Sequence, residues 1–327
     1  MSKTLKILSR PKGNAEEYGR WSVNPYIGCS HGCLYCYLKK GPSGAYLGQD
    51  APVLKKGVVN EEHAYHLAMA EIIANREEII HDGGLFMTFT SDPCEEQTRY
   101  LSLSIAHDAA YQMHIPVMIL TKNATFLDID PNTSKILGID KTEEWRRSIP
   151  FYHTGNGRLI FIDNPHFTTD ADPIAFGFTL TGHDELEPKA SPNTDRINAL
   201  QRLTKRGFKT WASIEPVLDF PHSLDMIYQA LNAGCQHFKI GLLTDRTRVV
   251  RKDFQIGEYQ FKAYDFTECL RFIDEVMQMT DGKATVYWKQ SVRDLLSTEL
   301  YEDTIEDIIG NYQHSVGKDW DMFKKEG

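Results

Sequence analysis

The chain has 327 residues, 41% of them hydrophobic and 25% charged, and a formal net charge of −9. This composition excludes a mostly disordered protein, and the length fits about two domains or one α/β barrel. The acidic balance argues against tight, nonspecific nucleic-acid binding by the whole surface, although it does not exclude a local basic groove. No run of about 18 apolar residues predicts a membrane span. Because the polar N-terminus also lacks the apolar core of a secretory signal, we expect a cytoplasmic protein.

The predicted elements follow one another in a strand-then-helix order after an irregular lead-in (residues 1–20) and a cysteine-containing loop. Asn60 is placed to cap a helix over residues 61–80. Apolar segments predict strands over residues 85–90, 117–121, 174–180, 210–214, 237–243 and 285–288. Amphipathic segments between them predict helices over residues 95–113, 194–206, 223–233 and 265–279.

Strands that alternate with helices indicate βαβ units and a parallel sheet. We predict an α/β fold of the partial (β/α)6-type TIM barrel class, with an N-terminal cysteine loop. Residues 21–245 would form the core barrel, and residues 246–327 a C-terminal extension packed on it. An insertion over about residues 128–172 breaks the rhythm and contains a predicted hairpin of residues 149–153 and 158–163. In such barrels the chemistry gathers at the C-terminal ends of the strands.

Three of the six cysteines, Cys29, Cys33 and Cys36, lie close together in a C-x3-C-x2-C pattern. The other three are scattered, so the set does not form a disulfide framework and indicates a metal centre or catalysis. Thiolates are the usual ligands of iron–sulfur clusters. Three of them can bind three irons of a cubane and leave the fourth iron open to a small chelating molecule. Gly28 and Gly32 would let the backbone turn tightly around such a cluster.

A zinc site is the alternative, and it would make the chain a noncatalytic metal-binding module. Zinc prefers four closed ligands, often from paired C-x2-C knuckles, and this chain has one such knuckle. His31 is a candidate fourth ligand, but it lies inside the same short loop and would strain it. The spacing therefore favours an iron–sulfur cluster.

The cysteine loop and its aromatic neighbours resemble the signature of the radical S-adenosylmethionine superfamily. Within it, the text Gly28-Cys29-Ser30-His31-Gly32-Cys33-Leu34-Tyr35-Cys36-Tyr37 is similar to the spore photoproduct lyase-like branch. The likeness covers about residues 20–245. It includes the short matches Thr90-Ser91-Asp92, Thr121-Lys122, Phe178-Thr179-Leu180-Thr181, Leu186-Glu187-Pro188 and Ile214-Glu215-Pro216.

This resemblance implies an enzyme with two cofactors, a 4Fe–4S cluster on the three cysteines and S-adenosylmethionine. A one-electron donor such as flavodoxin or ferredoxin would reduce the cluster. The reduced cluster would cleave S-adenosylmethionine to methionine and a 5′-deoxyadenosyl radical, which abstracts hydrogen from a substrate. The protein would supply orientation and exclude water. The substrate and the subclass (lyase, transferase or oxidoreductase) stay open.

The resemblance also assigns residues to S-adenosylmethionine binding, and each has a structural alternative. The assigned set is Tyr35, Thr90, Ser91, Asp92, Lys122, Thr179, Thr181 and Glu215. The three residues that end in Asp92 would hold the methionine ammonium, or cap the following helix. Lys122 would pair with the methionine carboxylate, or be an ordinary surface lysine.

The remaining assignments are also open to two interpretations. Thr179 and Thr181 would bond the ribose, or pack in their strand. Glu215 needs a partner beside apolar strand residues. It would orient the ribose or the substrate, or pair with a buried lysine such as Lys239, although solvent exposure is the simpler expectation for Lys239 and Lys289.

Two residues are candidates for a catalytic role. Tyr37 flanks Cys36 and, like Tyr35, would relay hydrogen or stack on a ligand, or simply pack around the cluster. Spore photoproduct lyase has a hydrogen-donating cysteine at the place of Thr88 or Phe89, where this chain has none. Cys94 would take over as donor, or be a small buried thiol. This departure and the acidic charge place nucleobase repair behind an unidentified substrate, and nucleic acid is a less favoured partner.

Overall fold

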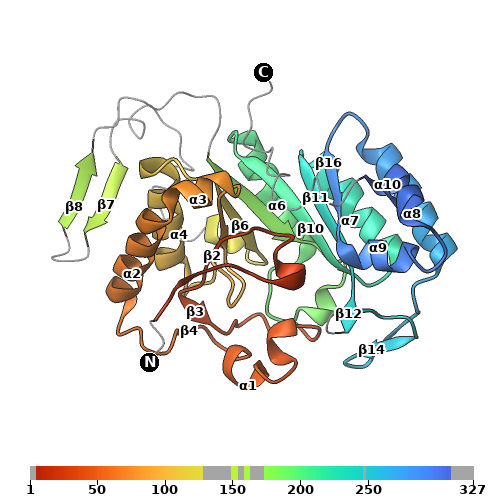
Figure 1. Ribbon diagram of the computed structural model, residues 1–327, viewed down its shortest axis with the longest axis horizontal. Coiled ribbons are helices and arrows are strands. Elements are labelled where there is room, and N and C mark those ends of the chain that lie inside the picture. Colours follow the sequence, from red (N-terminus) through yellow and green to blue (C-terminus); the bar gives the residue numbers. More distant parts are fainter. Residues whose placement is uncertain (1–4, 128–148, 154–157, 163–172, 246–247, 311–327) are drawn as a thin grey trace.

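The computed structural model describes residues 5–127, 149–153, 158–162, 173–245 and 248–310. Its centre is one eight-stranded sheet (Figure 1) in the order β1-β2-β5-β6-β9-β10-β11-β16. The strands span Leu8–Ser9, Ser22–Val23, Leu85–Met87, Val117–Thr121, Ile174–Thr179, Lys209–Val217, His237–Leu242 and Thr285–Trp288. Every neighbouring pair is parallel except β1–β2. The predicted α/β fold with a parallel sheet is therefore confirmed.

Helices follow the parallel strands and pack on the outer face of the sheet. They are α2 (Glu61–Ala74), α3 (Arg76–His81), α4 (Arg99–His107), α6 (Asn193–Lys205), α7 (Phe220–Asn232), α8 (Phe266–Thr280), α9 (Gln290–Leu296) and α10 (Glu302–Ile309). Asn60 caps α2 as predicted, because its side chain accepts a hydrogen bond from the His63 backbone. The helix predicted over residues 61–80 is interrupted at Asn75, and the strand predicted over residues 85–90 ends at Met87.

Alternating residues of the strands supply two separate apolar layers, as a two-residue period requires. The larger layer lies between the sheet and the helices. The smaller layer lines the inner face and consists of Tyr18, Phe86, Met118, Ala175 and Trp211. Gly177 makes room for the Trp211 ring, because a Cβ atom there would lie 2.1 Å from the indole.

Smaller elements border the sheet. In the insertion, β7 (Ile149–His153) and β8 (Arg158–Ile162) form the predicted antiparallel hairpin; the rest of the insertion lies outside the described residues. The pair β3 (Tyr26–Ile27) and β4 (Val53–Leu54) frames the cysteine loop. After β11, β12 (Thr244–Asp245) pairs with β13 (Arg248–Val249), and β14 (Phe254–Ile256) pairs with β15 (Tyr259–Phe261).

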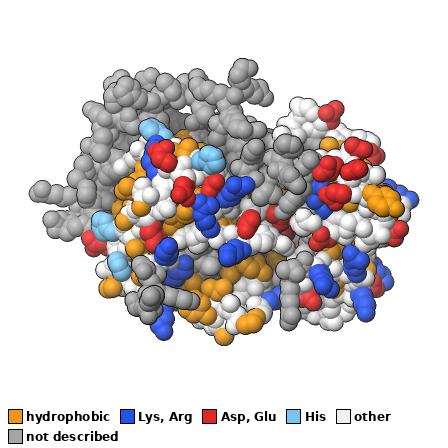
Figure 2. All heavy atoms as spheres, in the orientation of Figure 1, with side chains coloured by type: hydrophobic (Ala, Val, Ile, Leu, Met, Phe, Trp, Pro, Cys, Tyr) orange, Lys and Arg blue, Asp and Glu red, His pale blue; other side chains and the backbone are white. Residues whose placement is uncertain are grey.

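The sheet includes strands on both sides of the proposed core boundaries. Strand β1 comes from the lead-in and β16 from the C-terminal extension, and the division at residues 20 and 245 stays a prediction. Within the described part of the chain, the helices are all too short or too polar to cross a membrane. Figure 2 shows acidic side chains gathered over α8 and α10, whereas lysine and arginine side chains lie both near the middle of this face and along its lower right.

Candidate functional site

The cysteine loop lies where the loops after β5, β6 and β9 meet. Its first turn is fixed by Gly28, whose φ is +84° and whose missing Cβ would lie 2.5 Å from the Ala51 carbonyl oxygen. A larger residue would be strained there. Cys33 is buried, whereas Cys29 and Cys36 are partly exposed. The loop therefore presents its thiols at the C-terminal edge of the sheet, where a barrel of this class carries its chemistry.

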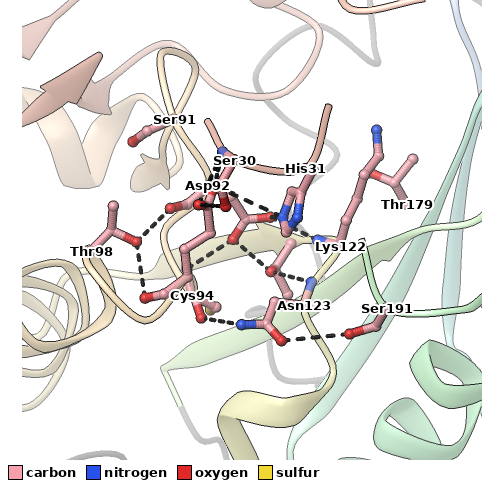
Figure 3. Close-up of polar contacts among 12 residues, drawn as sticks. Ser30, His31, Ser91, Asp92, Cys94, Thr98, Lys122, Asn123, Thr179 and Ser191 are labelled. Carbon is pink, nitrogen blue, oxygen red and sulfur yellow. Dashed lines mark hydrogen bonds and ion pairs between the residues drawn. The ribbon is translucent and has the colours of Figure 1, made fainter. Parts of the chain in front are cut away.

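Asp92 fastens the cysteine loop to the ends of two strands (Figure 3). Its Oδ1 accepts hydrogen bonds from Thr121 Oγ1 at 2.7 Å and from the Cys94 backbone at 2.8 Å. Its Oδ2 accepts from the Lys122 backbone at 2.8 Å and lies 2.9 Å from His31 Nε2. Burial alone would raise the pKa of Asp92, but His31 and these hydrogen bonds outweigh it and lower the pKa. The carboxylate is thus ionised and fully occupied by protein groups.

Glu95, three residues after Asp92, makes a second attachment to the cysteine loop. It accepts hydrogen bonds from the Ser30 backbone, at 3.1 Å to Oε2, and from the Ser30 hydroxyl. Burial, followed by the carboxylates of Glu95 and Asp92, raises the pKa of the Cys29 thiol well above its ordinary value. A cation or metal centre bound at the loop would lower the pKa of Cys29 again, because its positive charge stabilises the thiolate that metal ligation requires.

Lys122 lies beside the cysteine loop and is not the surface lysine of the alternative interpretation. Its Nζ lies 2.7 Å from the Tyr35 hydroxyl, 3.7 Å from Cys33 Sγ and 3.2 Å from Glu187 Oε1. Glu187 also accepts from Tyr35 and forms a buried ion pair of 2.6 Å with Arg196. Although burial raises the pKa of Glu187, Lys122 and Arg196 lower it to about 2. Two cations therefore face one buried carboxylate, which leaves positive charge next to Cys33.

The hydroxyl residues of the predicted set bond mainly to the protein itself. Thr90 Oγ1 donates to the Tyr26 carbonyl at 2.5 Å, and Ser91 Oγ lies 3.2 Å from Thr88 Oγ1. The Thr179 carbonyl accepts from Arg196 at 2.8 Å. Thr181 is fully buried, and its Oγ1 accepts from the His183 backbone at 3.3 Å. Their roles toward S-adenosylmethionine stay predictions.

Glu215 pairs with Lys289. Lys289 Nζ lies 2.6 and 2.8 Å from the two Glu215 oxygens, and the Tyr18 hydroxyl donates to the same carboxylate. Lys239 instead donates to the Glu17 carbonyl. Both lysines are only 2% exposed, so the expectation that they are solvated is wrong. The inner face of the sheet thus carries a buried polar network beside the apolar layer.

The two candidate catalytic residues differ in accessibility. Tyr37 is 63% exposed, and its hydroxyl donates to the Phe89 carbonyl. Cys94 has no exposed surface, and burial raises the pKa of its thiol well above the ordinary value. The position of Cys94 agrees with its interpretation as a small buried thiol.

Several site residues were not assigned a role from the sequence. The motif Leu186-Glu187-Pro188 marked Glu187 without indicating its partners, and Arg196 lies outside every motif. Glu17 and Tyr18 lie in the lead-in, about 200 residues from Glu215 in sequence. Sequence spacing carries no signal for such distant contacts.

The grouping of the donor atoms bears on the zinc alternative. A tetrahedral zinc ion with Zn–S bonds of about 2.3 Å needs sulfur atoms about 3.8 Å apart. Among the described residues, the groups with all donor atoms within 4.8 Å unite Cys29 with His31 and Glu95, but do not unite the three cysteines. A cubane takes one thiolate on each of three irons and does not require the three sulfur atoms to share one ion, so the cluster assignment of the cysteines stays a prediction.

Comparisons with known proteins agree with this architecture. No protein-family model matches the chain, and no curated protein matches it in sequence. Among solved structures, a spore photoproduct lyase mutant with bound AdoMet and dinucleoside spore photoproduct has a TM-score of 0.55 and 16% identity, over 88% of this chain and 81% of that chain. Streptococcus suis SuiB bound to precursor peptide SuiA has a TM-score of 0.50 and 12% identity, over 88% and 53%. The chain therefore has the fold of spore photoproduct lyase, which confirms the predicted resemblance at the level of the fold.

Proposed function

We propose that the chain is a radical S-adenosylmethionine enzyme. The observation that carries this proposal is the cysteine loop itself. Buried contacts of Asp92 and Glu95 hold this loop at the C-terminal edge of a parallel sheet. Cys29, Cys33 and Cys36 would hold a 4Fe–4S cluster. The cluster would supply the electron that splits S-adenosylmethionine into methionine and a 5′-deoxyadenosyl radical.

The residues around the loop have the charges that such a site needs. Lys122 lies 3.7 Å from Cys33 Sγ, where a cation stabilises a thiolate and can also pair with a bound carboxylate. Tyr35 and Glu187 hold the Lys122 side chain in this position. Tyr37 is exposed at the same loop and would contact a bound ligand there.

The substrate is expected to differ from the thymine photoproduct. Thr88 and Phe89 offer no thiol, and Cys94 is enclosed by protein. A hydrogen donor in the manner of spore photoproduct lyase is therefore not supported, and repair of a nucleobase lesion ranks second. An external flavodoxin or ferredoxin would supply the electron.

Metal content tests this assignment against the zinc-binding module. The protein would be reconstituted with iron and sulfide without oxygen, beside a Cys29/Cys33/Cys36→Ala variant. We expect about four irons and four sulfides per chain in the wild type, as a cubane requires, and none in the variant. Stoichiometric zinc that resists replacement by iron would contradict the proposal.

A further inference from the structure

A second group of metal-binding side chains lies outside the cysteine site. His183, Asp219 and His222 each offer one donor atom, and these atoms all lie within 4.8 Å of one another. His183 follows β9, whereas Asp219 and His222 belong to the first turn of α7. We propose that these three side chains bind a divalent transition-metal ion of the zinc type. The proposal is independent of the function of the cysteine loop.

The donor atoms converge on Asp219. Its Oδ2 lies 2.8 Å from His183 Nε2 and 2.9 Å from His222 Nδ1. The donors around a tetrahedral zinc ion lie about 3.4 Å apart, so the ion requires these atoms to separate by about half an ångström. His183 is buried, but the His222 side chain is exposed and that of Asp219 is partly exposed, so these two side chains can move apart and away from His183.

Glu185 holds the His183 ring in an orientation that suits metal binding. Its Oε1 lies 2.7 Å from His183 Nδ1, the ring nitrogen that faces away from Asp219. A carboxylate on the second nitrogen is the usual outer partner of a metal-bound histidine, because it fixes the ring and leaves Nε2 to the metal. The Phe261 ring packs edge-on against the His183 ring at 5.3 Å between centroids and restricts it further.

The backbone brings the two elements unusually close. Gly182 has a φ of +75°, and a Cβ atom on it would lie 2.9 Å from His222 Cβ. Only glycine allows this approach, which places the His183 and His222 ring centroids 4.5 Å apart. The close packing of the backbone at Gly182 therefore sets the distance between His183 and His222.

The surroundings select the kind of ion. Two imidazoles with one carboxylate suit zinc and similar ions, whereas calcium and magnesium prefer oxygen ligands.

His183 and Asp219 also line a pocket of about 470 Å³, together with Glu268 and Lys262. Lys262 is paired with Asp253 at 3.0 Å. Three protein ligands would leave a coordination position open toward this pocket for water or a small ligand.

Zinc binding by the full chain tests the proposal. The Cys29/Cys33/Cys36→Ala background removes thiol ligands, so the result does not depend on the cluster. Zinc affinity would be measured by calorimetry and the ligand field by the visible absorption of bound Co²⁺. We expect one ion per chain, and at least about tenfold weaker binding for His222→Ala, Asp219→Asn and the outer-partner variant Glu185→Gln.

Two features keep this test decisive. Asn is as good a helix cap as Asp, so Asp219→Asn removes the charged ligand without removing the cap of α7. His66→Ala removes an exposed histidine on α2 and is the matched control, with affinity expected to stay unchanged. If the background protein binds no zinc, or if all four variants bind it equally, the site does not exist.

Discussion

His31 Nε2 lies 2.9 Å from Asp92 Oδ2, and both side chains are buried. This pair joins the middle of the cysteine loop to the segment that follows β5. The same carboxylate also accepts from Thr121 and from the Lys122 backbone at the end of β6. One residue therefore sets the position of the loop relative to two strands, before any cofactor is bound.

We expect Asp92→Asn to destabilise the metal-free protein. Both oxygens of the Asp92 carboxylate accept hydrogen bonds, whereas an asparagine amide has only one acceptor oxygen. At least one buried donor therefore loses its partner. The expected loss in the free energy of unfolding is about 1–3 kcal/mol, measured by urea denaturation. Asp50→Asn, at an exposed acid that pairs with Lys39, should unfold like the wild type. An unchanged midpoint for Asp92→Asn would show that the pair does not anchor the loop.

We expect Lys289→Met to be more damaging than a surface lysine substitution. Lys289 contacts Glu215 at 2.6 Å and Glu17 at 3.4 Å, and its removal leaves two carboxylates without this cation. Breaking such a buried arrangement costs about 3–5 kcal/mol. The double variant Lys289→Met/Glu215→Gln should recover part of the stability in the same denaturation experiment. Equal losses for Lys289→Met and for Lys262→Met at the surface would contradict this role.

We expect His237 to make the protein less stable in mild acid. Burial, and then Lys239, lowers the pKa of His237 to about 3, against about 6.5 in an unfolded chain. Its neutral form is therefore favoured in the folded state. Its contribution to stability is complete above about pH 6.5 and is lost as the pH falls toward 3.

The expected loss between pH 7 and pH 5 is about 2 kcal/mol from this group. It would be measured as the slope of the unfolding free energy against pH. His237→Phe should flatten the slope, whereas the exposed-site variant His66→Ala should keep it. A slope that is the same in all three proteins would assign the acid sensitivity to other groups.

We expect Lys122→Met to weaken S-adenosylmethionine binding at least about tenfold, because it removes the cation beside Cys33. Equilibrium dialysis with the reconstituted protein measures this effect, and iron analysis of the same sample shows whether the cluster is retained. Lys40→Met, at an exposed lysine near the loop, is the control. Wild-type affinity in a cluster-loaded Lys122→Met protein would remove Lys122 from the proposed binding site.

The sequence predicted the repeating elements because each strand is long enough to show its pattern. Residues 117–121 and 285–288 are strands with the predicted bounds. The two-residue strands β1 and β2 are too short for any periodicity to appear, and they were missed. The break at Asn75 was missed because the apolar pattern continues through it.

The candidate site was predicted only where a local motif carried it. The three cysteines, Asp92 and Lys122 belong to short motifs, and the structure brings Asp92 and Lys122 to the loop that holds the cysteines. The partners of Glu187 and Glu215 come from distant segments, so their pairing depends on the folded sheet. The expectation of exposed lysines failed because Glu17 and Glu215 compensate the charge of Lys289, and the Glu17 carbonyl accepts a hydrogen bond from Lys239.

The formation of 5′-deoxyadenosine tests the central claim most directly. The wild type and the Cys29/Cys33/Cys36→Ala variant would be reconstituted, reduced without oxygen and given S-adenosylmethionine. The proposed function predicts 5′-deoxyadenosine and methionine from the wild type and neither from the variant. Equal amounts from both proteins, or a zinc-loaded wild type that forms no product, would contradict it.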